Sequence, residues 1–172
     1  MNQNNRPKRS EMFHPTPNGC VLQDLRFARA LEELYADELN AIATASYRSM
    51  LCEECDQELS ALFYEQMQDE IQHFRFLGEL ILALGGNPTL RTQIRVETMH
   101  RSDDPRSSCA KLSEELLYVA LRDKRRSIDR YQTMLGRTQD RVVRSLLCQL
   151  IDEEQRHSER LKNVSKDLGE SC

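Results

Sequence analysis

Residues 69–77 read DEIQHFRFL, and residues 153–161 read EEQRHSERL. The two segments share an acidic residue, a glutamate after it, a histidine three positions later and a leucine four positions after the histidine. Residues three apart lie on one face of a helix, so each segment places a carboxylate beside an imidazole. The repeat predicts two helices that each carry part of a metal site. The pairs are Glu70 with His73 and Glu154 with His157.

Both pairs interrupt apolar stripes that run at helical spacing, which predicts that they point into the core. Burying a carboxylate without a partner is costly, and a divalent metal ion is a natural partner for two facing glutamate–histidine pairs. His14 and His100 also follow a glutamate by three positions. We discount both, because one lies in a proline-rich tail and the other in an expected connection, although His100 folding back over the bundle stays open.

Glu38 interrupts a third apolar stripe, formed with Leu31 and Ala45 at intervals of seven residues. The distance from Glu38 to Glu70 along the chain is 32 residues. In a helical hairpin this is about 48 Å out and back at about 1.5 Å per residue, which can bring the two carboxylates to the same height. Glu38 is therefore a third predicted carboxylate ligand.

Proline and glycine divide the rest of the chain. From residue 20 to residue 84 there is no proline and one glycine, and Gly85-Gly86-Asn87-Pro88 then ends the helical pattern. Residues 89–107 look irregular and are long enough to cross the length of a bundle. We expect a flexible tail at 1–20 and an all-α antiparallel four-helix bundle at 21–168, as two helical hairpins joined by a long crossover. The predicted helices are 21–51, 56–84, 108–136 and 140–165.

The composition argues against several other classes of protein. Charged residues make up 30% of the 172 residues and the formal net charge is −4, so nucleic-acid binding is not expected. We find no membrane span and no secretory signal, which predicts a cytoplasmic protein. The six cysteines are then expected to be mostly free thiols, and the role of the pair Cys52 and Cys55 is left open.

The segments at 38–42 (ELNAI), 69–88 and 152–161 together resemble the bacterioferritin/rubrerythrin branch of the ferritin-like superfamily, over roughly residues 22–165. The resemblance implies a di-metal carboxylate site in which Glu38 and His73 serve one metal and His157 the other. Glu70 and Glu154 would then bridge the two. A bacterioferritin-like haem site would need methionine in place of Ile71, so no haem is expected.

The third long helix departs from this family pattern, because Lys124 stands where a glutamate ligand is expected. Three interpretations remain open. The lysine can supply the charge of a second metal, or Asp123 can turn inward as a substitute ligand, or the site can be degenerate and bind no metal. Tyr131, seven residues after Lys124 on the same stripe, is a tentative catalytic residue.

The resemblance implies a non-haem metal protein with one or two Fe per chain, with Mn or Zn as alternatives. Its expected chemistry is ferroxidase- or peroxidase-type oxidoreductase activity with O2 or peroxide and an unknown electron donor. An iron-storage cage subunit and a non-catalytic helical bundle are the alternatives. The chain is also expected to form a homo-oligomer, a dimer or larger.

Overall fold

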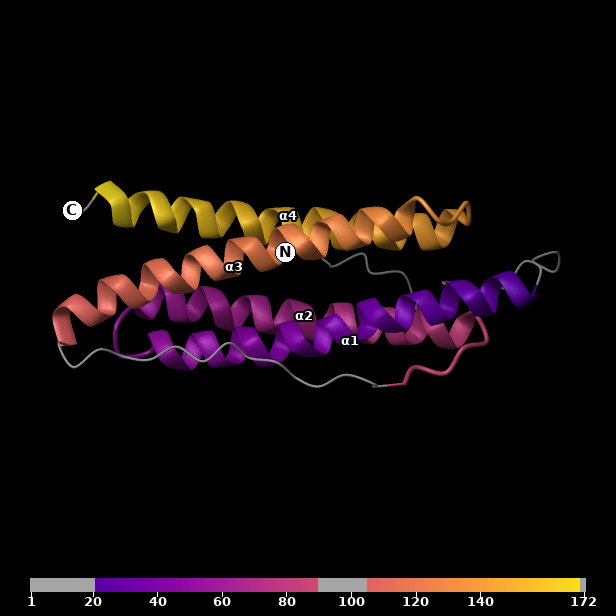
Figure 1. Ribbon diagram of the computed structural model, residues 1–172, viewed down its shortest axis with the longest axis horizontal. Helices are drawn as coiled ribbons and strands as arrows, with labels where there is room; N and C mark the ends of the chain where they lie inside the picture. The colour runs from indigo at the N-terminus through magenta and orange to yellow at the C-terminus, as the bar shows by residue number, and fades with distance from the viewer. Residues whose placement is uncertain (1–20, 90–104, 171–172) are drawn as a thin grey trace, which may run out of the picture.

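Four helices account for almost all of the part of the chain that the computed structural model describes, which is residues 21–89 and 105–170, and no strand occurs there (Figure 1). The predicted tail and His100 lie outside these residues. None of the described helices has the length and apolar character that crossing a lipid bilayer requires. The helices are α1 (Val21–Cys52), α2 (Gln57–Ala83), α3 (Pro105–Leu135) and α4 (Arg141–Glu170).

The helices form two antiparallel hairpins, α1 with α2 and α3 with α4, which pack against each other along their lengths (Figure 1). Helix α2 ends at one end of the bundle and α3 begins at the other end, so these two helices run parallel (Figure 1). The chain between them therefore connects opposite ends of the molecule. This arrangement confirms the predicted all-α four-helix bundle of two hairpins and one long crossover.

The helix ends follow local chemistry. Asp56 caps α2, because its side chain accepts a hydrogen bond of 2.9 Å from the Leu59 backbone N–H. Gly85 ends α2 with a φ of 79°, a conformation in which glycine has no steric penalty. Helix α3 begins at Pro105, earlier than predicted, since a proline at the first helical position sacrifices no intrahelical hydrogen bond. Helix α4 continues to Glu170, beyond the predicted end at residue 165.

Within the described helices, the buried apolar side chains form two separate clusters. The first contains Ala28, Leu31, Leu34, Leu77, Leu80, Ile81, Tyr131, Met134, Val143, Leu147, Leu150 and Ile151. The second contains Cys52, Leu59, Leu62, Phe63, Leu112, Leu116, Leu117, Ala120 and Leu161. On every helix, buried charged or imidazole side chains stand between the residues of one cluster and those of the other. The bundle therefore has a polar layer across its middle.

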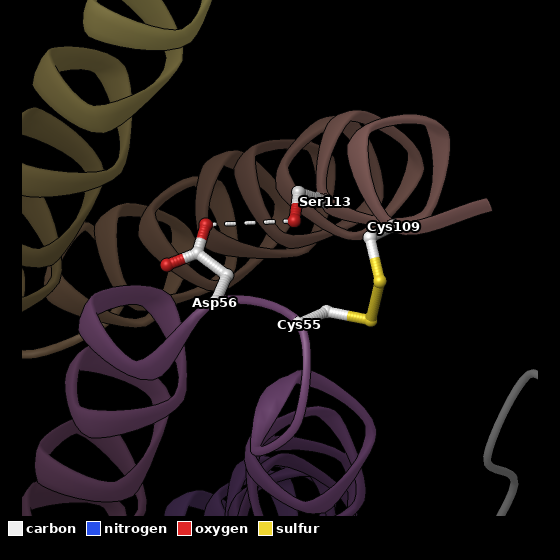
Figure 2. Close-up of a disulfide and its surroundings, with 4 residues drawn as sticks. All are labelled: Cys55, Asp56, Cys109 and Ser113. Carbon is white, nitrogen blue, oxygen red and sulfur yellow. Dashed lines mark hydrogen bonds between the residues drawn. A yellow bond between two sulfur atoms is a disulfide. The ribbon is translucent and has the colours of Figure 1, made fainter. Parts of the chain in front are cut away.

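A disulfide bond joins Cys55, in the turn between α1 and α2, to Cys109 near the start of α3, with a Cα–Cα distance of 5.3 Å (Figure 2). The expectation of free thiols is wrong for these two residues, because the crossover brings the start of α3 to that turn. Beside the bond, Ser113 donates a hydrogen bond of 3.5 Å to Asp56 (Figure 2). Cys52 is a buried free thiol, and burial raises its pKa to about 12.

Candidate metal centre

Four ligand-type side chains from three helices meet in the polar layer: Glu38 from α1, Glu70 and His73 from α2, and Glu154 from α4. One ligand atom from each lies within 4.8 Å of the corresponding atoms of the others. All four side chains are buried, none more than 2% exposed. The structure thus brings together four of the five residues that the sequence proposed as ligands.

The Nδ1 atom of His73 lies at the middle of this cluster. It is 3.0 Å from Glu70 Oε2, 3.5 Å from Glu154 Oε1 and 3.7 Å from Glu38 Oε2. Burial lowers the pKa of His73, but hydrogen bonds to the surrounding carboxylates outweigh burial and hold its pKa well above the usual value. Burial, together with the charge of Glu70, raises the pKa of Glu38 to about 8. In the absence of a metal ion, protons therefore neutralise much of the cluster at pH 7.

The two histidines are oriented reciprocally across the bundle. His73 on α2 makes a hydrogen bond of 2.8 Å through Nε2 to Glu153 on α4, and His157 on α4 makes one of 2.9 Å through Nε2 to Asp69 on α2. A histidine that ligates a metal commonly holds its second nitrogen against a carboxylate in this way. Sequence reasoning missed both carboxylates, although each stands directly before the glutamate of its segment.

His157 approaches the cluster without joining the four-residue group. Its ring centroid is 6.4 Å from that of His73, and its Nδ1 is buried without a hydrogen-bond partner. Burial, followed by the charge of Lys124, lowers the pKa of His157. A neutral imidazole is the form that ligates metals, so His157 keeps a free nitrogen in the ligating form at neutral pH.

Lys124 enters the cluster from α3. Its Nζ donates a hydrogen bond to Glu70 Oε1 and lies 3.0 Å from Glu154 Oε2. Burial alone would raise the pKa of Glu70, but the ammonium group beside it holds that pKa well below the usual value. Asp123, the possible substitute ligand, instead pairs with Arg48 at 2.5 Å and with Arg122 at 3.1 Å. The structure therefore turns Lys124, and not Asp123, toward the glutamates.

Tyr131, on α3, contacts the Glu38 carboxylate of the cluster. Its buried hydroxyl donates a hydrogen bond of 2.5 Å to Glu38 Oε1. Burial and the neighbouring Glu38 raise the pKa of Tyr131 well above the usual value, so it is a neutral phenol across the ordinary pH range. Tyr131, the tentative catalytic residue of the sequence analysis, thus contacts a ligand-type carboxylate directly.

The donor atoms that lack partners show whether this site suits a cation. Glu38 Oε2 and His157 Nδ1 are both buried, and neither has a hydrogen-bond partner among the residues that the structure describes. Buried polar atoms in native proteins are rarely left without one, and both of these are electron-pair donors. Carboxylate oxygens and imidazole nitrogens are ligands for iron, manganese and zinc. The residues present therefore fit a divalent metal ion.

Comparison with known proteins identifies the family. The profile of the ferritin-like domain matches residues 28–170. The chain belongs to this ferritin-like family. No protein among those with curated descriptions matches the sequence of this ferritin-like protein.

Two solved bacterioferritins share its fold. One, from Desulfovibrio desulfuricans, has a diiron site studied in different catalytic states. It is 22% identical, with a TM-score of 0.75 over 87% of this chain and 84% of the bacterioferritin. The other, from Rhodobacter capsulatus, has a metal-free dinuclear site and a heme iron. It is 20% identical, with a TM-score of 0.64 over 80% of this chain and 82% of the other.

Proposed function

We propose that this ferritin-like protein binds iron or manganese at Glu38, Glu70, His73 and Glu154, and that its function is redox chemistry with O2 or peroxide. The observation that supports this most is the convergence of these four ligand types, from three helices, within 4.8 Å in a buried layer. The diiron site of the bacterioferritin from Desulfovibrio desulfuricans, which shares the fold, favours iron as the metal.

The chain's own residues divide the work. Glu38, Glu70 and Glu154 provide oxygen donors, and His73 Nδ1 provides nitrogen, while Glu153 holds the opposite side of that ring. Tyr131 fixes the rotamer of Glu38 through its hydrogen bond. The apolar clusters on both sides of the layer limit the access of water. A bound iron or manganese ion would supply electrons to the oxidant. A separate electron donor would then have to return the metal ion to its reduced state.

A non-catalytic bundle is the second candidate, because the ion pairs of Lys124 with Glu70 and Glu154 already compensate two of the carboxylates. In that case the polar layer would be a network of salt bridges. The two candidates differ in one measurable property, the metal content of the protein.

Elemental analysis of freshly purified protein, with and without the substitution Glu70→Gln, tests the proposal. The wild type is expected to contain at least one Fe or Mn per chain. Because Gln keeps the shape of Glu70 but removes its charge, the variant should bind the metal about 100-fold more weakly or worse. Adding Fe(II) at 100 times the dissociation constant should stabilise the metal-free wild type by about 2.7 kcal/mol.

The matched control is Glu65→Gln, an exposed glutamate on the same helix, which should leave metal content unchanged. A wild-type protein that purifies without metal, and whose melting temperature does not respond to Fe(II) or Mn(II), would refute metal binding and favour the non-catalytic bundle.

A further inference from the structure

Lys124 is a buried cation inside a cluster of carboxylates. Only 7% of the residue is exposed, and its Nζ contacts one glutamate on α2 and one on α4. Both of these glutamates belong to the candidate metal centre. The ammonium group therefore stands between two of the candidate ligands.

Each of the two glutamates has one carboxylate oxygen near Lys124 and the other near His73. Glu70 Oε1 accepts a hydrogen bond from Lys124 Nζ, and Glu70 Oε2 lies 3.0 Å from His73 Nδ1. Glu154 Oε2 lies 3.0 Å from Lys124 Nζ, and Glu154 Oε1 lies 3.5 Å from His73 Nδ1. One oxygen of each carboxylate is thus engaged by a fixed positive charge. The other faces the side where Glu38 Oε2 has no hydrogen-bond partner.

The charges of the cluster indicate how many divalent cations it can hold. Glu38, Glu70 and Glu154 bring three negative charges when ionised as ligands, and Lys124 brings one positive charge. One divalent cation makes the cluster neutral. A second would leave an excess of two positive charges in a buried site, which is unfavourable without further anions.

We infer that Lys124 takes the place of a second metal ion, so that the centre holds a single divalent cation between His73 Nδ1 and the free oxygens of Glu38, Glu70 and Glu154. This inference rests on the proposed function, because it assumes that the centre binds metal. The bridging glutamates then join a metal on one side to an ammonium group on the other. His157, which lies outside the four-residue group, is not a ligand of the single ion.

Binding of Mn(II) to the metal-free full-length protein tests the inference, with metal per chain measured by elemental analysis and the spin state by electron paramagnetic resonance. The wild type should bind one Mn(II) with the hyperfine pattern of an isolated ion. Lys124→Glu adds the missing carboxylate and should bind two, with the spectrum of a spin-coupled pair. Lys111→Glu makes the same change at an exposed position of α3, where the side chain is 73% exposed, and should behave as the wild type.

Each outcome separates the two proposals. Two spin-coupled ions in the wild type would overturn the role of Lys124 while leaving metal binding intact, and this result does not depend on any variant folding. A folded Lys124→Glu variant that still binds one ion would overturn it as well. If the wild type binds none, the proposed function fails, and a Lys124→Glu variant that binds metal would then show that the lysine blocks the whole site.

Discussion

The hydrogen bond from Tyr131 holds Glu38, the residue that α1 contributes to the candidate metal centre. It joins α3 to α1, and within the described part of the chain it occupies Oε1 of Glu38, while Oε2 of the same carboxylate has no hydrogen-bond partner. A buried carboxylate oxygen that loses its donor bears the full cost of leaving water. The hydroxyl of Tyr131 therefore stabilises the fold as well as positioning a ligand.

Tyr131→Phe removes the donor and keeps the ring in the core. We expect the metal-free protein to lose about 1–3 kcal/mol of stability, because Glu38 Oε1 is left buried without a partner. For a chain of this size that is a fall in melting temperature of roughly 3–10 °C. Tyr118→Phe is the matched control, since Tyr118 is on the same helix and 72% exposed. Equal melting temperatures for the two variants would contradict the role of the hydrogen bond.

At this scale, sequence reasoning located the ligand-type residues better than it located their partners. Glu38, Glu70, His73 and Glu154 are found from the phase of three helical stripes, because a charged residue on an apolar stripe stands out. The contacts of Asp69 and Glu153 depend on how far α2 and α4 are rotated toward each other, which helical periodicity does not determine. The choice between Lys124 and Asp123 also depended on rotation, here of α3.

At the scale of the elements, the disulfide between Cys55 and Cys109 ties the α1–α2 turn to the start of α3. Its two cysteines are 54 residues apart, and the loop that they close includes all of α2 and the crossover. Closing a loop of this length restricts the unfolded chain and stabilises the folded one. Bonds of this kind are most common in oxidising compartments, and the cytoplasmic location stays a prediction.

Reducing this bond should lower the free energy of unfolding by about 2–4 kcal/mol, as measured by urea denaturation with and without a phosphine reductant. Cys109→Ser should show the same loss and no further response to the reductant. Cys148→Ser, at an exposed free cysteine, should keep the stability and the response of the wild type. A wild type whose stability does not respond to the reductant would contradict a structural role for the bond.

The all-α four-helix pattern could be predicted because the helix interiors contain good helix formers and several helix ends carry strong signals, such as the cap at Asp56 and the turn at Gly85. The ends of α3 and α4 were less accurate, since a helix can begin at a proline and nothing in the sequence marks the last turn of α4. The pairing of Cys55 with Cys109 could not be predicted from spacing. It depends on which end of the bundle the crossover reaches.

At the scale of the whole molecule, the polar layer separates the two apolar clusters of the described core from each other. Each cluster has contributions from all four helices and can hold its end of the bundle together. The layer is the part of the core where stability depends on charges being balanced, and thus on what occupies the metal centre.

Hydrogen exchange with and without metal tests this division. After removal of metal by a chelator, backbone amides near Glu38, His73 and Glu154 should exchange faster, while amides around Leu147 and Leu116 in the two clusters should keep most of their protection. Adding Mn(II) back should restore protection in the layer. An equal loss of protection along all four helices would show that the core behaves as one unit.

The reciprocal contacts of His73 with Glu153 and of His157 with Asp69 have a consequence in terms of symmetry. In each of them the histidine of one hairpin is held by the acidic residue that stands just before the glutamate of the other hairpin. Beside these contacts, α1 contributes a buried carboxyl group, Glu38, and α3 contributes a buried ammonium group, Lys124. The two hairpins are therefore alike in how each holds the histidine of the other, and unlike in the ionisable side chain that α1 and α3 bring to the layer.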